Sequence, residues 1–421
     1  MSASTLKKAG LKAKTAGKPR PLAAKQVKAV SPVNHAGDSF SADDYTYMQR
    51  AITLAKKGHY TTSPNPRVGC VIVKDRKIVG EGYHIKAGTG HAEVHALAMA
   101  KEQARGAIAY VTLEPCSHFG RTPPCAQALI NSGVEQVVVA MVDPNPQVSG
   151  SGISLLEQAG IKTKVGLLTE QAQALNPGFI KMMSTGLPYV RCKLASSLDG
   201  KTAMANGESK WITSPQARSD VQRLRAQSCA IITGADSVLM DQAKMTVRWQ
   251  ELGQLKENYP QNDIRQPLRV IIDSQNRITP DLPLFDTPSE VLLVRAAIEN
   301  NHQWPSFVQQ IQLPLAATAS GCEKIDLKHL LHALAQRGLN DVLLESGARL
   351  AGAFIEQDLV DELVLYQAPK LMGGDGKSLV AMPGIENLSA AKALAIKDIA
   401  MVGPDIRITA KLEENKTCLP E

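Results

Sequence analysis

The stretch that decides the fold of the N-terminal half is His91-Ala92-Glu93, followed by Leu113-Glu-Pro-Cys-Ser-His-Phe-Gly-Arg-Thr-Pro-Pro-Cys125. His91 begins a segment that we expect to be helical, and Cys116 follows a short apolar run that is typical of a strand. Cys125 lies near the start of a second expected helix. Because helices that follow neighbouring strands begin at the same end of a sheet, we expect these three side chains to converge.

The convergent side chains have the chemistry of a zinc site. One imidazole and two thiolates bind zinc tetrahedrally, and three protein ligands leave a fourth position for water, as in catalytic sites. Glu93 follows His91 by two residues, so its carboxylate can face that water and move its proton without ligating. The alternatives are a structural zinc with a fourth ligand such as His95 or His118, and buried cysteines that hold no metal. We expect one catalytic zinc per chain.

Alternating strands and helices surround these motifs. The expected N-terminal elements are a helix over 43–57 capped by Asp43–Asp44, strands over 68–73 and 78–84, a helix over 91–104, a strand over 108–113, a helix over 124–132, a strand over 136–142, and helices over 155–160 and 169–185 around a short strand. The short connections indicate a sheet covered by helices.

A second alternating phase follows Gly186-Leu187-Pro188. It has expected strands over 189–195, 229–233, 268–273, 291–295, 341–345 and 362–367, and helices over 215–227 and 347–357. Ser214-Pro215 is a typical helix start, with Ser as the cap and Pro in the first turn. We therefore expect two α/β domains that meet near residues 185–188.

Composition and charge narrow the class of protein. The chain has 421 residues, of which 44% are hydrophobic and 21% are charged, as in a globular protein with two or three domains. The net charge of +7 is carried by residues 1–40, and the remainder is balanced, which argues against a nucleic-acid-binding surface. We expect residues 1–40 to be a disordered basic tail; a transit peptide and a weak nucleic-acid tether are the alternatives.

Cysteine usage and hydropathy indicate the compartment. The seven cysteines are an odd number in a long chain, which does not suit a disulfide framework and favours a reducing compartment. No apolar run is long enough for a membrane-spanning helix, and no secretory signal is recognisable. We expect a cytoplasmic protein that binds neither membranes nor nucleic acid.

At this point a family resemblance becomes visible. The segments His91-Ala-Glu-Val-His-Ala96 and Leu113–Cys125, together with Pro64-Asn-Pro-Arg-Val-Gly-Cys70 and Gly80-Glu-Gly-Tyr-His84, resemble the bifunctional riboflavin-biosynthesis deaminase/reductase family. The wide spacing between Cys116 and Cys125 departs from the general H-x-E…P-C-x-x-C signature of zinc deaminases and is typical of this family. The resemblance covers roughly residues 42–414. It implies a cytidine-deaminase-like α/β/α domain over 41–186 and a dihydrofolate-reductase-like α/β domain over 187–414.

The resemblance also implies the residues of the deaminase site. The implied zinc ligands are His91, Cys116 and Cys125, and the implied proton shuttle is Glu93. The implied substrate contacts are Asn65, His84, His118 and Arg121. An Asn can pair with a pyrimidinone edge, and an Arg suits a phosphate.

The C-terminal half resembles the reductase domain of the same family, which uses NADPH. The resemblance is carried by Lys193-Leu-Ala-Ser-Ser-Leu-Asp-Gly-Lys-Thr-Ala203 and Gly207-Glu-Ser-Lys-Trp-Ile-Thr-Ser214. It implies cofactor contacts from Ala195, Trp211, Ser237, Asp241, Ser274 and the stretch from Gly347. It implies substrate contacts from Ser209, Arg225, Met245, Arg248 and Glu345, with the arginines as phosphate clamps.

The residues alone give weaker support for the cofactor site. No G-x-G-x-x-G follows a strand. The run from Glu345 to Gly352 is a strand that ends in a Gly turn and opens a helix, so its N–H groups can receive a pyrophosphate, or it is an ordinary strand–helix turn. The chain departs from the family at Asp241-Gln242-Ala243, where Asp-Asp-Pro is usual, and at Ser346-Gly347-Ala348, where Gly-Gly-Pro is common.

The leading functional interpretation is a bifunctional enzyme acting on a small phosphoribosylated pyrimidine. It would deaminate 2,5-diamino-6-(5-phosphoribosylamino)pyrimidin-4-one with zinc and then reduce the ribosyl arm with NADPH, giving 5-amino-6-(5-phosphoribitylamino)uracil. The alternatives are a deaminase whose second domain only binds ligand, a nucleic-acid-editing protein and a structural zinc module. We also expect a homo-oligomer.

Overall fold

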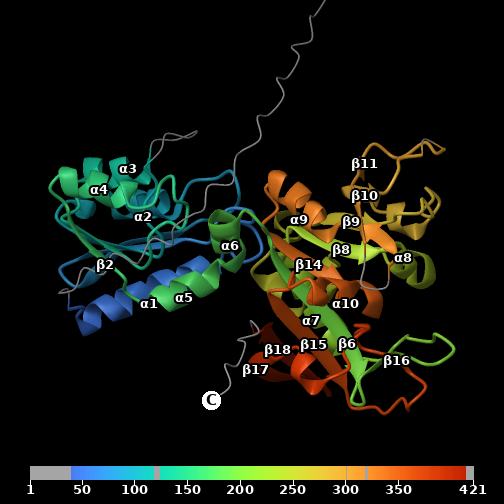
Figure 1. The fold of residues 1–421 in the computed structure, drawn as a ribbon. Coiled ribbons are helices and arrows are strands. Elements are labelled where there is room, and N and C mark those ends of the chain that lie inside the picture. The colour runs from blue at the N-terminus through green and yellow to red at the C-terminus, as the bar shows by residue number, and fades with distance from the viewer. Residues whose placement is uncertain (1–38, 118–123, 300, 318–320, 414–421) are drawn as a thin grey trace, which may run out of the picture. The chain divides into compact units, whose positions relative to one another are not determined.

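The computed structural model describes residues 39–117, 124–299, 301–317 and 321–413 (Figure 1). We predicted a tail over residues 1–40, and residues 1–38 of it lie outside the described residues. Among the described helices, none combines the length and the apolar composition that crossing a membrane requires.

The N-terminal half contains a five-stranded sheet in the order β2-β1-β3-β4-β5. Strand β1 pairs antiparallel with β2 and β3, whereas β3, β4 and β5 are parallel. The strands are β1 (Gly69–Lys74), β2 (Lys77–Tyr83), β3 (Ile108–Val111), β4 (Gln136–Val139) and β5 (Lys162–Val165). This is the helix-covered sheet that the alternating pattern predicts.

Helices cover both faces of this sheet (Figure 1). On one face lie α2 (Ala92–Ala100), α3 (Cys125–Ser132) and α4 (Ser151–Gln158), which share an apolar cluster with the strands. On the other face lie α1 (Ala42–Lys56) and α5 (Thr169–Leu175). Helix α6 (Pro177–Thr185) ends this half of the chain. Helices α2 and α3 therefore lie on the same face of the sheet, and their first residues carry or adjoin the predicted zinc ligands His91 and Cys125.

Three helix predictions differ from the structure. The cap of α1 is Ser41, and Asp44 completes a capping box, so the predicted cap by Asp43–Asp44 is wrong. Helix α4 begins at Ser151 and not at residue 155. The single helix predicted over 169–185 is two helices, because Pro177 disfavours a helical backbone at Asn176 and begins α6. The Asn176 side chain forms hydrogen bonds of 2.7 and 2.9 Å with the backbone of Arg67.

The C-terminal half contains a nine-stranded sheet in the order β11-β10-β9-β8-β14-β6-β15-β18-β17. The strands from β11 to β15 in this order are parallel, and β18 and β17 are antiparallel additions. The strands are β6 (Tyr189–Ser197), β8 (Ala230–Gly234), β9 (Leu268–Ile272), β10 (Val291–Arg295), β11 (Val308–Gln312), β14 (Asp341–Glu345), β15 (Glu362–Ala368), β17 (Leu394–Val402) and β18 (Asp405–Leu412).

Helices cover this second sheet as well. Helices α9 (Leu327–Gln336) and α10 (Ala348–Glu356) pack on one face, and α7 (Pro215–Gln227) and α8 (Ala235–Asp241) pack on the other. The predicted Ser214 cap of α7 is present. Two small ribbons complete this half, β7 (Lys201–Ala203) with β16 (Lys377–Ser378) and β12 (Leu315–Ala317) with β13 (Glu323–Ile325). The sequence analysis did not predict β11, β17, β18, α8 or α9. Strand β18 does alternate apolar and polar residues from Ile406 to Leu412, whereas a register shift after Ile396 breaks the alternation of β17.

Candidate active sites

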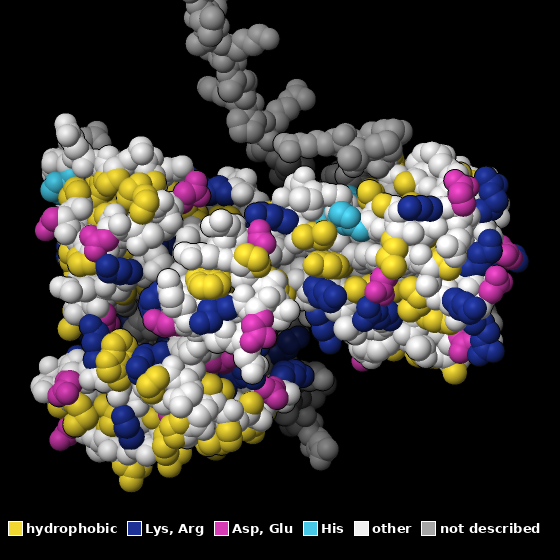
Figure 2. Space-filling model, turned by 180° about the vertical axis from the view of Figure 1, so that it is seen from behind, with side chains coloured by type: hydrophobic (Ala, Val, Ile, Leu, Met, Phe, Trp, Pro, Cys, Tyr) yellow, Lys and Arg dark blue, Asp and Glu magenta, His cyan; other side chains and the backbone are white. Residues whose placement is uncertain are grey.

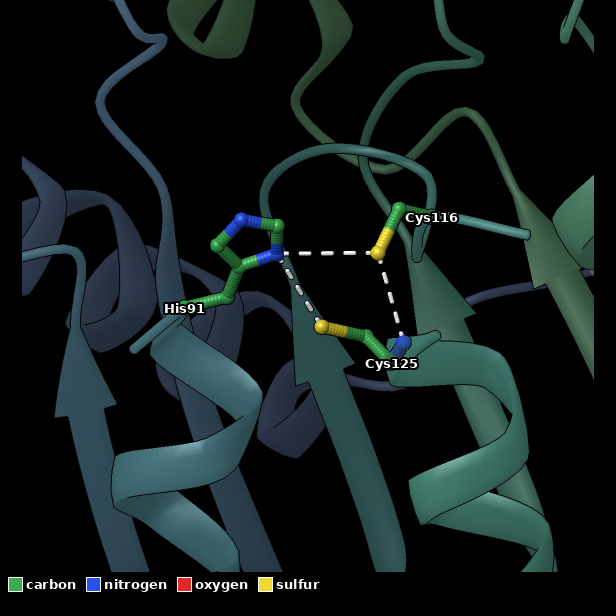
Figure 3. Close-up of side chains that lie close together, drawn as sticks. All are labelled: His91, Cys116 and Cys125. Atoms are coloured by element: carbon green, nitrogen blue, oxygen red, sulfur yellow. Dashed lines mark hydrogen bonds between the residues drawn. The ribbon is translucent and has the colours of Figure 1, made fainter. Parts of the chain in front are cut away.

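The three zinc-ligand candidates come together at the helix starts. His91 is the residue before α2, Cys116 follows β3, and Cys125 is the first residue of α3. Their donor atoms all lie within 4.8 Å of one another. The Nδ1 atom of His91 lies 3.2 Å from the Sγ atom of Cys125 and 3.6 Å from that of Cys116. Figure 3 shows the three side chains pointing toward a common centre.

This donor set fits a zinc ion. Zinc–ligand bonds of roughly 2.0–2.3 Å in a tetrahedron place neighbouring donors roughly 3.5 Å apart, close to the separations seen here. The backbone N–H of Cys125 also donates to the Cys116 sulfur at 3.3 Å. Hydrogen bonding with Cys125 and His91 lowers the pKa of the Cys116 thiol to about 4, so this thiolate forms readily.

Glu93 has the environment of a proton carrier. Its side chain lies in the first turn of α2 and is only 3% exposed. Burial raises the pKa of its carboxyl group from 4.5 to about 7. A carboxyl group with such a pKa can hold or release a proton near neutral pH.

Two of the predicted substrate contacts lie beside the ligands. The His84 ring lies 5.6 Å from the His91 ring between centroids. His84 Nδ1 lies 3.1 Å from the Gly90 carbonyl, which assigns its proton there and leaves Nε2 facing the Asn65 amide at 3.3 Å. The other two predicted contacts, His118 and Arg121, lie outside the described residues.

One residue of this site was missed in the sequence. Glu114, directly before Pro115-Cys116, is 5% exposed, and its carboxylate accepts four backbone N–H groups. The donors are Gly152 at 2.8 Å, Gly150 at 2.9 Å, Asp143 at 3.0 Å and Ile153 at 3.4 Å. Glu114 thereby fastens the segment 143–153 to the strand end that carries Cys116. The sequence signal that could have identified Glu114 was its position two residues before Cys116, a predicted zinc ligand.

The C-terminal half holds a buried ionic cluster at the end of β14. Arg225 of α7 forms a two-pronged ion pair with Glu345, with distances of 2.6 and 2.9 Å. Lys193 of β6 lies opposite Glu345 in the parallel register. Burial alone would raise the pKa of Glu345, but Arg225 and Lys193 outweigh it and lower that pKa. Sequence reasoning named Arg225 and Glu345 but assigned no role to Lys193.

Unpartnered hydroxyls mark the strand ends beside this cluster. The side-chain oxygens of Ser196, Thr233 and Ser346 are buried, and the structure gives them no hydrogen-bond partner. They lie at the carboxyl ends of the adjacent parallel strands β6, β8 and β14, where open α/β sheets bind ligands. Gly347 begins α10, whose N-terminus has no side-chain cap. These free polar groups fit a cofactor with many hydrogen-bonding atoms.

The other predicted cofactor contacts lie on α8, before α7, on β6 and after β9. Ser237 and Asp241 belong to α8, and the Asp241 carbonyl accepts a 2.9 Å hydrogen bond from Lys210, the residue before Trp211. Trp211 is 64% exposed and stacks under Arg218 at 4.4 Å. Ala195 belongs to β6, and Ser274 follows Asp273, which forms a buried ion pair with Arg295.

The remaining predicted reductase contacts differ in how exposed their side chains are. Arg248 forms an exposed ion pair with Glu251, in which Nη2 of Arg248 lies 2.8 Å from Oε2 of Glu251. Met245 is 3% exposed and packs in an apolar cluster with Val238, so little of its side chain is accessible. Ser209 lies in the segment before Trp211 and is half-buried.

Comparison with known proteins identifies the family. Residues 41–141 match the family described as "Cytidine and deoxycytidylate deaminase zinc-binding region", and residues 188–408 match "RibD C-terminal domain". The chain is 53% identical over 365 residues to the riboflavin biosynthesis protein RibD of Escherichia coli, covering 86% of this chain and 98% of the relative. The chain belongs to the RibD family.

Other RibD proteins give the same result. The RibD of Haemophilus influenzae is 50% identical, covering 88% of this chain and 98% of the relative. The solved Acinetobacter baumannii RibD has a TM-score of 0.79 and 43% identity, covering 88% of this chain and 99% of that one. This RibD-family chain is therefore an enzyme of riboflavin biosynthesis with a zinc-binding deaminase domain and a reductase domain, as its sequence motifs predict.

A third solved relative carries both activities in its name. The Thermotoga maritima diaminohydroxyphosphoribosylaminopyrimidine deaminase/5-amino-6-(5-phosphoribosylamino)uracil reductase has a TM-score of 0.75 and 31% identity. The match covers 88% of this chain and 99% of the relative.

Proposed function

We propose that this chain deaminates 2,5-diamino-6-(5-phosphoribosylamino)pyrimidin-4-one and then reduces the ribosyl arm, releasing 5-amino-6-(5-phosphoribitylamino)uracil. The observation that carries the proposal is the convergence of His91, Cys116 and Cys125 within 4.8 Å, with a buried Glu93 in the same helix turn. Hydrolytic deamination needs this combination of metal donors and a carboxyl group that carries protons.

In the deaminase domain, His91, Cys116 and Cys125 would hold one zinc ion. When bound, zinc supplies a Lewis acid that activates water at neutral pH. Glu93 takes up a proton from the attacking water and delivers it to the departing amine. Its pKa of about 7 suits both steps, because the carboxyl group can accept and release a proton near neutral pH. Asn65 and His84 orient the pyrimidine edge, because their amide and imidazole face each other at 3.3 Å beside the ligands. His118 and Arg121 stay predicted contacts.

In the reductase domain, binding and orientation do most of the work. NADPH, when bound, supplies the hydride. The free hydroxyls of Ser196, Thr233 and Ser346 and the start of α10 at Gly347 are the groups that we assign to cofactor binding. The cluster of Arg225, Glu345 and Lys193 holds the substrate arm, with Glu345 kept ionised by its two cationic neighbours.

The test follows ammonia and NADPH separately. Purified protein is incubated with the diaminopyrimidinone phosphoriboside, with and without NADPH. We expect ammonia release in both mixtures and NADPH consumption only after deamination. Ammonia release without NADPH consumption supports the alternative of a deaminase whose second domain only binds ligand. If the protein neither releases ammonia nor consumes NADPH, the proposal is overturned.

The organisation of the whole chain is part of the same proposal. We place the boundary between the domains at residues 186/187, supported by α6 ending at Thr185 and β6 of the second sheet beginning at Tyr189. We propose a cytoplasmic homo-oligomer that binds its small-molecule substrate and neither membranes nor nucleic acid.

A further inference from the structure

Residues 242–248 join α8 to the 3₁₀ helix η2 (Trp249–Glu251) and form neither a helix nor a strand. They carry Met245 and Arg248, two of the predicted substrate contacts of the reductase. The backbone turns sharply at Met245, whose φ of 55° is one that residues with a side chain rarely adopt. Because such a segment has no regular hydrogen-bond ladder of its own, its shape depends on the groups that bind its backbone.

Gln266 acts like a neighbouring strand on one edge of this segment. Its side-chain amide accepts a hydrogen bond from the Val247 N–H at 2.8 Å and donates one to the Val247 carbonyl at 2.9 Å. One residue of an antiparallel strand exchanges the same two hydrogen bonds with its partner. Gln266 lies two residues before the start of β9 at Leu268, so its backbone is anchored next to the sheet.

Helix α7 binds the opposite edge of the segment. Gln222 accepts a hydrogen bond from the Arg248 N–H at 2.9 Å, and Arg225 donates one to the Thr246 carbonyl at 3.0 Å. In an extended chain, the polar groups of these alternate residues point to one side, and those of the residue between them point to the other. Residues 246–248 therefore have the hydrogen bonds of a central strand, with side chains as the partners.

This arrangement also separates the side chains of Val247 and Arg248. Val247 is 5% exposed and packs with Tyr60 and Leu252 in an apolar cluster. Because successive side chains of an extended chain point to opposite faces, burying Val247 in that cluster directs Arg248 away from it. The Arg248 side chain is 44% exposed, so its guanidinium can reach an anionic ligand.

A phosphate bound at this site would depend on individually placed donors. On the face of the described residues that Figure 2 shows, Lys and Arg side chains lie scattered among acidic ones. A single exposed charge attracts an anion weakly in water, whereas a guanidinium that meets a phosphate through two N–H groups binds it firmly in one orientation. The contribution of Arg248 therefore depends on how its backbone is held.

We propose that Gln222 and Gln266 are positioning residues of the reductase site. They fix the Arg248 N–H and both polar groups of Val247, and so set the direction in which the Arg248 side chain leaves the backbone. Gln222 is 1% exposed, so its hydrogen bond is shielded from competing water. The inference rests on the proposed reductase function and adds to it the residues that hold its predicted phosphate clamp.

The test measures binding of the proposed product, 5-amino-6-(5-phosphoribitylamino)uracil, to the full-length protein by calorimetry. Gln266→Ala removes two hydrogen bonds through an exposed position, and Gln222→Leu removes one while keeping a similar volume. We expect each to raise the dissociation constant at least about 5-fold. Gln261→Ala is the control, because Gln261 is an exposed glutamine of the 3₁₀ helix η4 (Gln261–Asp263), in the same connection before β9.

Two comparisons separate positioning from a general loss of structure. Arg248→Ala should weaken binding about 10-fold or more, and adding Gln266→Ala to it should weaken binding little further, because the side chain that Gln266 positions is already gone. The same compound without its phosphate should bind the wild type, Gln266→Ala and Gln222→Leu alike. Circular dichroism confirms that each variant is folded.

The outcomes distinguish this inference from the proposed function. If the wild type binds the product but neither Gln266→Ala nor Gln222→Leu changes its dissociation constant, the positioning role is overturned and the reductase proposal stands. Losses that add fully to that of Arg248→Ala, or that are equal for the compound without phosphate, overturn the positioning role as well. A wild type that binds no product overturns the reductase proposal and the positioning role together.

Discussion

Glu93 combines a fixed position with an adjustable charge. The first turn of α2 carries it two residues beyond His91, which begins that helix. The same packing that removes the carboxyl group from water raises its pKa to about 7. A surface carboxylate at this place in the helix would stay ionised and could not return the proton it accepts.

The first prediction separates the shuttle from the ligands. In Glu93→Gln, size and hydrogen bonding are kept but no proton can be accepted. We expect zinc content to stay near one per chain, deamination to fall at least ~10²-fold, and reduction of the deaminated intermediate to stay unchanged. Metal analysis, ammonia release and NADPH consumption measure the three quantities. Deamination near the wild-type rate would mean that another group carries the proton.

The second prediction concerns Glu114. In Glu114→Gln, one carboxylate oxygen becomes an amide donor that faces backbone donors, so hydrogen bonds to Gly150 and Asp143 or to Gly152 and Ile153 are lost. Hydrogen bonds to a charged group contribute roughly 1.5–3 kcal/mol each, so we expect a lower melting temperature and faster zinc loss to a chelator. Glu135→Gln is the control, since its ion pair with Lys162 is exposed. Equal zinc retention in both variants would refute the clamp.

At the scale of elements, β14 connects the two halves of the chain. Its last residue, Glu345, belongs to the ionic cluster, and Asn340, which precedes its first residue, donates a 2.7 Å hydrogen bond to the carbonyl of Pro64. Pro64 is followed directly by Asn65. The Asn340 side chain also accepts from the buried Cys229 thiol at 3.2 Å, and that sulfur lies 2.8 Å from the Ser63 hydroxyl. The reductase half thus supports the loop that carries a deaminase contact.

The third prediction tests this support. Asn340→Asp keeps the acceptor for Cys229 and loses the donor to Pro64, and Asn340→Ala loses both. We expect each to raise the KM of deamination by loosening the Asn65 loop, with a cost of roughly 0.5–1.5 kcal/mol for the lost hydrogen bond, because the exposed Pro64 carbonyl can bind water instead. The kcat of reduction should change little. Steady-state kinetics of both reactions decide the matter, and an unchanged deaminase KM in both variants contradicts the coupling.

At the scale of the whole molecule, each sheet has its own apolar core, but the two halves also touch. Tyr60 packs against Ala226, Val247, Leu252 and Ile264 of the second half. The Tyr259 hydroxyl donates a 2.6 Å hydrogen bond to the Lys57 carbonyl. Cutting the chain between the halves exposes these groups without removing a strand from either sheet.

The fourth prediction follows from this construction. A fragment that begins at Leu187 should fold, bind NADPH in preference to NADH, and reduce the deaminated intermediate without zinc. Its melting temperature should be lower than that of the intact chain, because the Tyr60 contacts are lost. Circular dichroism, cofactor titration and NADPH consumption measure these properties. A folded fragment that binds no dinucleotide would mean that the departures at Gln242, Ala243 and Ala348 have disabled the site.

The sequence by itself determined the features that depend on neighbouring residues. His91-Ala-Glu93 sets a ligand and a proton carrier on one helix turn, and Ser214-Pro215 starts α7, because capping and helical spacing are local properties. The alternation of strands and helices likewise predicted two α/β sheets. The family motifs added the reductase, for which the residues alone offered no dinucleotide signature.

Only the tertiary structure decided the contacts between distant segments. The Asn176 side chain binds the backbone of Arg67, far back in the chain, and Glu114 acts as a clamp through donors at residues 143–153. Lys193 meets Glu345 because β6 and β14 are adjacent in the sheet. The alternation of β17 breaks after Ile396 because a bulge shifts its register against β18. Such contacts arise from the order and register of strands, which no local pattern of residues encodes.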